Sequence, residues 1–241
     1  MSKRRKNQNI ITGSLKWILK GKSKKQKILI LLAVSITLTL SMLPEENFKI
    51  QEQDLQVHFL DVGQGDATLI TNDGQSMLID AGDNTMGTKV QLYLQKQNIK
   101  KLDYLIGTHP DADHIGGLDV IITKFECDTI FMPDVEKDTQ TYNDVVEAID
   151  RKGYQYLEPD VGERFTLGDA SITVIAPNSI YEDMNNASIG ILIEHGENSF
   201  LFTGDAEEEA EYDMLNNGLD LNADVYKVGH HGSSSSTCRE F

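Results

Sequence analysis

The stretch Thr108-His109-Pro110-Asp111-Ala112-Asp113-His114 contains two imidazoles and two carboxylates that are common metal ligands. It follows an apolar run at residues 102–107, which predicts a buried strand, and it precedes residues 115–118, which predict the start of a helix. Without a cation, four such groups within six residues would repel one another or lose their solvation. The pattern therefore predicts a divalent metal site on a rigid strand-to-helix turn.

The same stretch resembles the HxHxDH signature of the metallo-β-lactamase superfamily, with Asp111 in the place of the second histidine. Further segments, in the same order along the chain, resemble the C-terminal hydrolase domain of the ComEC family of DNA-uptake proteins. These segments are VHFLDVGQGD at 57–66, LIDAG at 78–82, NNAS at 185–188, LFTGD at 201–205 and VGHHGS at 228–233. The resemblance covers residues 55–236 and implies the αββα fold of that superfamily.

Hydrophobic periodicity predicts the same fold class, because two runs of strands alternate with helices. The predicted strands cover residues 55–60, 67–71, 76–80, 103–108, 129–132, 164–167, 171–176, 188–194, 199–203 and 223–228. The predicted helices cover residues 89–97, 118–124, 142–152 and 206–215. Mixed sheets with outer helices predict an α/β protein built as an αββα sandwich.

The resemblance also implies a two-metal site and assigns a role to each ligand. His109 and Asp111 match the ligands of a first ion. Asp113 and His114 match the ligands of a second ion, which would hold the nucleophile, so these two residues are the expected catalytic pair. Asp205, which ends the segment 201–205, matches the carboxylate that bridges the two ions.

The last ligand is one of His230 and His231, and we prefer His230. The third histidine that the superfamily uses for the first ion is absent, and Asn186 and Ser188 occupy that part of the order. We expect two divalent ions, with zinc as the first choice. Carboxylate oxygens in place of imidazole nitrogens make the first site a harder set of ligands in the Lewis sense, which makes manganese the alternative.

Other polar residues are expected around the ligands. Asp80 is expected to accept a hydrogen bond from a ligand imidazole, and a plain turn role is its alternative. Ser233 is expected to donate to a substrate phosphate, unless the serine run to which it belongs is a flexible tail. The residues expected to line the site or contact substrate are Asp61, Gln64, Asp66, Asn186, Ser188, His231 and Ser233.

The N-terminal region differs from the rest, since residues 1–27 contain ten of the 22 Lys and Arg residues and no acid. Residues 28–44 carry no charge, and as a helix they would span about 25 Å, slightly less than a hydrocarbon core of about 30 Å. We expect a basic cytoplasmic tail at 1–27 and an uncleaved single-pass signal anchor at 28–44. A cleaved signal peptide, which would make the protein secreted, is the alternative.

Residues 45–241 are long enough for one compact domain outside the cell. The resemblance implies a final strand and helix after His231, where ten residues follow, so we expect the domain to lack these two elements. Cys127 and Cys238 are the two cysteines of the chain. We expect two free thiols, with a disulfide as the alternative.

A two-metal site suits phosphodiester hydrolysis, so we expect a phosphodiesterase or nuclease that acts on extracellular DNA. Residues 45–241 carry 12 basic and 38 acidic residues, a net charge of −26, which argues against tight nonspecific DNA binding. Short or single-stranded DNA is therefore the expected substrate. Alternatives are a noncatalytic module that binds metal or nucleotide, and a hydrolase of a lactone, thioester or β-lactam. The sequence indicates no oligomeric state.

The charge pattern predicts the topology of the chain. Protease added to intact cells should digest the globular domain and spare residues 1–27, because all ten N-terminal cations precede the uncharged segment. Immunoblotting with antibodies to each end measures this. Protection of the domain from protease would reverse the predicted orientation.

Overall fold

The structure is a computed structural model that describes residues 21–28, 30 and 54–241. The chain divides into two units, Met1–Lys49 and Ile50–Phe241. In the first unit, residues 24–28 and 30 are helical. The membrane segment expected at 28–44 lies outside the described residues, apart from residues 28 and 30. Among the described residues, no helix has both the length and the apolar character that a membrane crossing requires.

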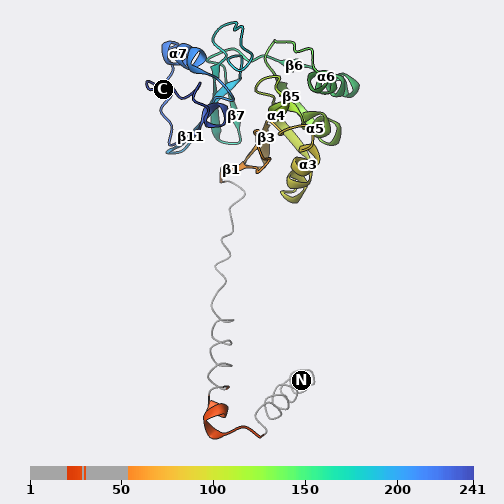
Figure 1. Ribbon diagram of the computed structural model, residues 1–241, viewed down its shortest axis with the longest axis vertical. Coiled ribbons are helices and arrows are strands. Elements are labelled where there is room, and N and C mark those ends of the chain that lie inside the picture. Colours follow the sequence, from red (N-terminus) through yellow and green to blue (C-terminus); the bar gives the residue numbers. More distant parts are fainter. Residues whose placement is uncertain (1–20, 29, 31–53) are drawn as a thin grey trace. The chain divides into compact units, whose positions relative to one another are not determined.

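A six-stranded sheet forms the first half of the second unit, in the order β1-β2-β3-β4-β5-β6. An antiparallel meander of β1 (Gln56–Phe59), β2 (Thr68–Asn72) and β3 (Gln75–Ile79) comes first. It continues in parallel with β4 (Lys101–Ile106), β5 (Glu126–Phe131) and β6 (Tyr156–Leu157). The helices α3 (Gly87–Lys96), α5 (Leu118–Lys124) and α6 (Gln140–Lys152) cover its outer face, and the short helix α4 (Ala112–Ile115) follows β4 (Figure 1).

A five-stranded sheet forms the second half, in the order β11-β10-β9-β8-β7. The strands β7 (Arg164–Leu167), β8 (Ala170–Ala176), β9 (Gly190–His195) and β10 (Asn198–Phe202) pair antiparallel. The edge strand β11 (Val225–Lys227) runs parallel to β10. Helix α7 (Glu208–Asn216) packs on the outer face of this sheet.

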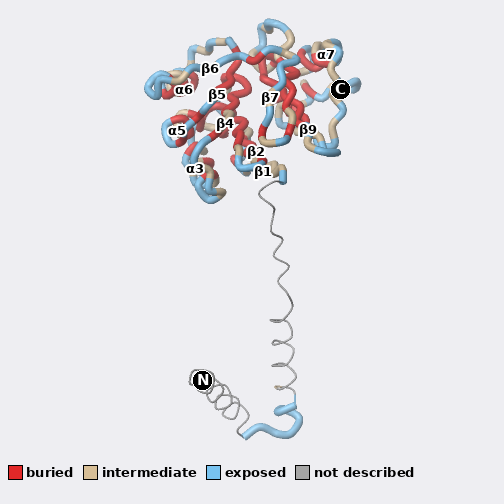
Figure 2. Tube along the Cα trace, turned by 180° about the vertical axis from the view of Figure 1, so that it is seen from behind, coloured by how far each residue is buried: buried red, intermediate tan, exposed pale blue. Residues whose placement is uncertain are grey.

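Three hydrophobic layers hold these elements together, as the buried segments of Figure 2 indicate. Side chains of a strand alternate between its two faces. In β3, Leu78 therefore points to the layer under the helices, whereas Met77 and Ile79 point to the layer between the sheets. In β9, Leu192 faces α7 while its neighbour Ile191 faces the other sheet. The expected αββα sandwich is confirmed.

Some element boundaries differ from the expected ones for local reasons. Helix α6 begins at Gln140, two residues early, because the Thr139 hydroxyl accepts a hydrogen bond from the backbone N–H of Tyr142. The strand expected at 103–108 occupies Lys101–Ile106, because the backbone N–H of Thr108 binds the carboxylate of Asp80 instead of a neighbouring strand. The two-residue strand β6 was not expected.

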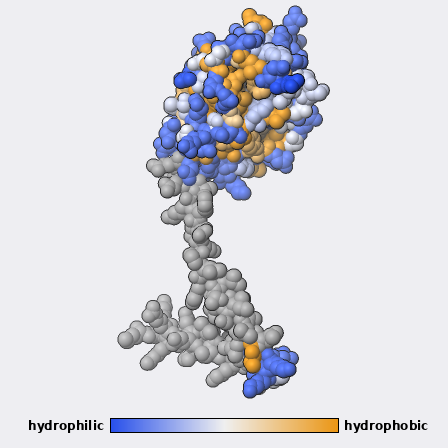
Figure 3. All heavy atoms as spheres, turned by 90° about the vertical axis from the view of Figure 1, so that its left-hand side faces the viewer, coloured by the Kyte–Doolittle hydropathy of each residue, from blue (hydrophilic) through white to orange (hydrophobic). Residues whose placement is uncertain are grey.

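The residues after β11 pack back against α7. The buried carboxylate of Glu211 accepts hydrogen bonds from the backbone N–H groups of Thr237 (2.5 Å) and Cys238 (2.7 Å). An open groove of about 420 Å³ lies beside them, and Figure 3 shows apolar residues gathered on this side of the domain. Within the described residues, β11 is followed by a 3₁₀ turn at Gly229–Gly232 and by no further strand or helix.

The two cysteines are free thiols, as expected. Cys127 on β5 is only 5% exposed, and burial raises the pKa of its thiol to about 12. Cys238 is partly exposed, and burial raises the pKa of its thiol as well. Since the thiolate is the reactive form, a thiol reagent at about pH 8 should modify Cys238 in the folded protein and Cys127 only after denaturation. Absorbance of the released chromophore measures this. In the control variant Cys238→Ser the fast reaction should disappear, and two fast thiols in the native protein would contradict the packing of Cys127.

Candidate metal centre

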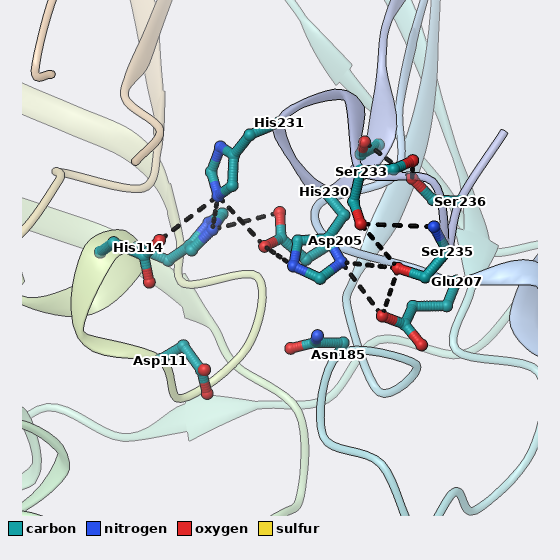
Figure 4. A network of polar contacts seen from close by, with 12 residues as sticks. Asp111, His114, Asn185, Asp205, Glu207, His230, His231, Ser233, Ser235 and Ser236 are labelled. Carbon is teal, nitrogen blue, oxygen red and sulfur yellow. Dashed lines mark hydrogen bonds and ion pairs between the residues drawn. The ribbon is translucent and has the colours of Figure 1, made fainter. Parts of the chain in front are cut away.

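Strand ends from both sheets deliver the polar cluster shown in Figure 4. The chain after β4 carries His109, Asp113 and His114, and the chain after β10 carries Asp205. The third loop, after β11, carries the pair His230 and His231. Because β4 belongs to the six-stranded sheet and β10 and β11 to the five-stranded one, packing of the two sheets is what brings these side chains together.

Two glycines allow the loops to approach closely enough. A Cβ at Gly65 would lie 2.3 Å from the carbonyl oxygen of Asp113, and the φ angle of Gly65 is +125°. A Cβ at Gly204 would lie 2.8 Å from the Ser188 hydroxyl, and its φ angle is +55°. Both positions therefore require glycine, because a side chain there would collide with the neighbouring loop.

Four contacts define the centre of the cluster. Nε2 of His114 lies 3.2 Å from Nε2 of His231 and 3.2 Å from Oδ1 of Asp205. Nε2 of His231 lies 3.2 Å from Oδ2 of Asp205 and 3.3 Å from Oδ2 of Asp113. Ligands at zinc bonds of about 2.0–2.2 Å in tetrahedral geometry are separated by about 3.3 Å. His114, Asp205 and His231 therefore have the mutual spacing that ligands of one tetrahedral ion require, and Asp113 contacts this group through His231.

One buried nitrogen in the cluster, Nε2 of His109, is without a hydrogen-bond partner in the described part of the chain. Nε2 of His109 lies 4.0 Å from Oδ2 of Asp205, too far for a hydrogen bond. A buried polar atom without a partner costs free energy, and a cation bound by Nε2 of His109 would remove this cost. The residues present thus fit a metal ion.

Asp66 lies on the other side of the two rings. Ligand atoms of Asp66, His114, Asp205 and His231 all lie within 4.8 Å of one another. However, Asp66 approaches the Nδ1 atoms, at 3.6 Å from His231 and 4.0 Å from His114, and it forms an ion pair with Lys227. Asp113 instead contacts an Nε2 atom. These contacts favour Asp113 as the ligand and Asp66 as a group that orients the rings.

Asp80 lies where the sequence analysis expected it. Its Oδ2 lies 2.8 Å from Nδ1 of His114 and accepts a hydrogen bond from the Thr108 hydroxyl, and its Oδ1 accepts one from the Thr108 N–H. A carboxylate at Nδ1 holds the proton on that nitrogen and leaves Nε2 free to bind a metal. Asp80 is 1% exposed, so this hydrogen bond is shielded from water.

The carboxylate of Asp111 lies apart from the cluster, and its expected role as a ligand of the first ion stays a prediction. Its carboxylate forms an ion pair with Lys137, from the loop between β5 and α6, and this is its contact among the described residues. Figure 4 shows Asp111 apart from the histidines, with no contact to the residues drawn. The ammonium group of Lys137 competes with a metal ion for the carboxylate of Asp111.

The two adjacent histidines, His230 and His231, point to different partners, and the preference for His230 as the last ligand stays a prediction. The structure places His231 against His114 and Asp113, whereas Nδ1 of His230 lies 3.1 Å from Oε1 of Glu207. Both histidines have positive φ angles, 45° and 51°, and this backbone turns the two neighbouring rings in different directions. Because His230 and His231 are adjacent in the sequence, the sequence alone could not show which of the two rings faces the cluster.

The remaining expected residues lie at varying distances from the centre. The side chains of Ser188 and Asn186 accept hydrogen bonds from the backbone N–H groups of Asp205 and Glu207, so they shape the loop after β10. Asp61 is exposed and lies 3.6 Å from Lys89, and Ser233 bonds Ser235 rather than a histidine. Gln64 is exposed on its turn.

Sequence reasoning missed three residues at the site, Lys137, Lys227 and Glu207. Glu207 belongs to a run of three acids, residues 207–209, at the start of α7. Lys227 could have been found from the sequence. It lies three residues before His230, on the strand that leads into this loop, so its ammonium group can reach the same site.

The electrostatics of the cluster reflect concentrated negative charge. Burial lowers the pKa of His114, but Asp80 and Asp205 outweigh burial and raise it well above its ordinary value. Contacts with Asp205 and Asp66 raise the pKa of His231 to about 9. Burial and the neighbouring His114 lower the pKa of His109 to about 4. Without metal, protons on imidazoles therefore balance the carboxylates.

Comparison with known proteins identifies this arrangement. A family model described as the metallo-β-lactamase superfamily matches residues 60–241. The chain belongs to this superfamily. Metallo-β-lactamase SMB-1 bound to 2-mercaptoethanesulfonate has a similar structure, with a TM-score of 0.53 and 13% identity over 73% of this chain and 76% of that one. At that identity the likeness concerns the fold.

Relatives within the superfamily agree with the ComEC resemblance. ComE operon protein 3 of Bacillus subtilis (strain 168) is 31% identical over 77% of this chain and 26% of the relative. Recombination protein 2 of Haemophilus influenzae is 32% identical over 76% of this chain and 22% of the relative. The chain spans about a quarter of the length of these two curated relatives, at 26% and 22%.

Metal binding should depend on pH. With a metal-free pKa of about 9, His231 is protonated at neutral pH, and an ion must displace that proton. The apparent zinc affinity should therefore rise between about pH 6 and pH 8, by about tenfold per pH unit for each displaced proton. Competition with a chromophoric chelator measures it.

Two variants sharpen this measurement. Asp66→Asn removes a carboxylate that raises the pKa of His231, so the pH dependence should become weaker. His195→Ala changes a histidine that pairs with Asp169 away from the cluster, and should leave the dependence unaltered. An affinity that does not change with pH would refute the protonated state of His231.

Proposed function

We propose that this chain is a metal-dependent phosphodiesterase that cleaves DNA outside the cell, as a step in DNA uptake. The observation that carries the proposal is the cluster in which His114 and His231 contact Asp205, and Asp113 contacts His231, with the spacing of metal ligands. Divalent ions in such a site supply Lewis acidity, which activates water near neutral pH and neutralises charge on phosphoryl oxygens.

The residues of the chain prepare the site for an anion. Asp80 and Asp66 hold the imidazoles of His114 and His231 in position. Lys227 and Lys137 lie next to the cluster, paired with Asp66 and Asp111, in a domain that is otherwise strongly acidic. Local cations can attract a phosphate where the net charge of the surface repels it.

Two further observations support the substrate and its location. The relatives include a protein named competence protein ComA, from Neisseria gonorrhoeae, 24% identical over 80% of this chain and 26% of the relative. The basic residues 1–27 and the uncharged residues 28–44 form the pattern of a signal anchor. In this proposal the domain faces outward, where it would meet short or single-stranded DNA.

One observation favours a second candidate, a noncatalytic module that binds metal or nucleotide. Asp111 is engaged by Lys137, so the first ion has fewer ligands than the superfamily signature provides. A centre with one well-formed site suits binding or sensing as well as hydrolysis.

An activity assay separates the two candidates. The full-length chain, loaded with zinc or manganese, should cleave end-labelled single-stranded DNA and bis(p-nitrophenyl) phosphate. Asp113→Ala should lower the rate by about a hundredfold, because it removes one metal ligand. Asp150→Ala, which alters an exposed aspartate on α6, is the matched control. A folded, metal-loaded chain that cleaves neither substrate would favour the noncatalytic module.

A further inference from the structure

The pair His230 and His231 places two imidazoles around one carboxylate oxygen. Nε2 of His231 lies 3.2 Å from Oδ2 of Asp205, and Nε2 of His230 lies 3.8 Å from the same atom. The ring centres are 6.0 Å apart and the ring planes are inclined by 70°. Two rings with this separation and inclination can each present a nitrogen to Asp205 without competing for one position (Figure 4).

His230 is held in the same way as His114. Oε1 of Glu207 lies 3.1 Å from Nδ1 of His230, as Oδ2 of Asp80 does at 2.8 Å from Nδ1 of His114. The hydroxyl of Ser235 donates to Glu207 at 2.7 Å and so fixes the position of that carboxylate. With the proton on Nδ1, Nε2 of His230 carries a free lone pair that faces Asp205.

A third nitrogen faces the same oxygen. Nε2 of His109 is buried, without a hydrogen-bond partner among the described residues, and 4.0 Å from Oδ2 of Asp205. Two ligands with bonds of about 2.1 Å to one ion lie between about 3 Å and about 4.2 Å apart, depending on the angle between the bonds. The distances from Asp205 to His109 and to His230 both fall within this range.

We propose that His230 is a ligand of the first metal ion, together with His109 and Asp205, and that Glu207 orients it. In this assignment His231 serves the second ion with Asp113 and His114, and the two adjacent histidines serve one ion each. His230 thereby replaces the histidine that is missing near Asn186 and Ser188. The proposal rests on the metal centre of the proposed function, but not on its substrate.

Metal stoichiometry tests the assignment without an activity measurement. The full-length chain reconstituted with zinc should bind two ions, and His230→Ala and His231→Ala should each bind one. In the double variant both ions should be lost or strongly weakened. His195→Ala is the control for loss of a histidine outside the cluster, and circular dichroism checks that each variant is folded.

A milder variant isolates the orienting role of Glu207. Glu207→Gln keeps His230 in place but removes the negative charge at Nδ1, so the affinity of one ion should fall by about 10-fold to 100-fold. Glu208→Gln, at the exposed neighbouring position, should leave both affinities unchanged. Long-range ¹H–¹⁵N NMR of labelled histidine should show that zinc shifts the Nε2 resonance of His230 while Nδ1 keeps its proton.

Each outcome separates this assignment from the proposed activity. Two full-affinity ions in His230→Ala, or a His230 Nε2 resonance that zinc does not shift, would overturn the assignment. One ion in the wild-type chain that depends on His231 alone would overturn it as well. The predicted stoichiometry in a chain without phosphodiesterase activity would support the assignment and count against the proposed function. A wild-type chain that binds no ion would overturn both.

Discussion

The carboxylate of Asp205 is the group on which the centre depends. It is 3% exposed, and four imidazoles lie 3.2–4.0 Å from its oxygens. An isolated buried charge of this kind would be strongly destabilising, so the surrounding structure must supply positive charge. Burial would raise the pKa of Asp205, but contacts with His114 and His231 outweigh burial and lower it. A divalent ion would satisfy the same demand more completely than protonated imidazoles.

The αββα sandwich meets this demand by bringing the ends of β4, β10 and β11 together. Each strand is positioned by the apolar layers on its two faces, so the loops after the strands inherit fixed positions. Gly65 and Gly204 then remove the side chains that would keep the loops apart. Carboxylates behind the rings, Asp80 at His114 and Glu207 at His230, determine which nitrogen of each imidazole faces inward.

Charge is distributed unevenly within this acidic domain. Lys137 and Lys227 both pair with carboxylates beside the centre, Asp111 and Asp66. These pairs limit the number of carboxylates that are free to bind an ion.

The sequence alone determined the fold class and the local part of the site. The strand patterns and the cluster His109-Pro110-Asp111-Ala112-Asp113-His114 depend on neighbours in the chain, and both could be interpreted from periodicity and spacing. The tertiary structure decided that His231 rather than His230 contacts His114, that Asp111 pairs with Lys137, and that Glu207 holds His230. The physical reason is that these contacts join residues 23 to 117 positions apart or depend on two left-handed backbone angles, and only the packed sheets fix which charges meet.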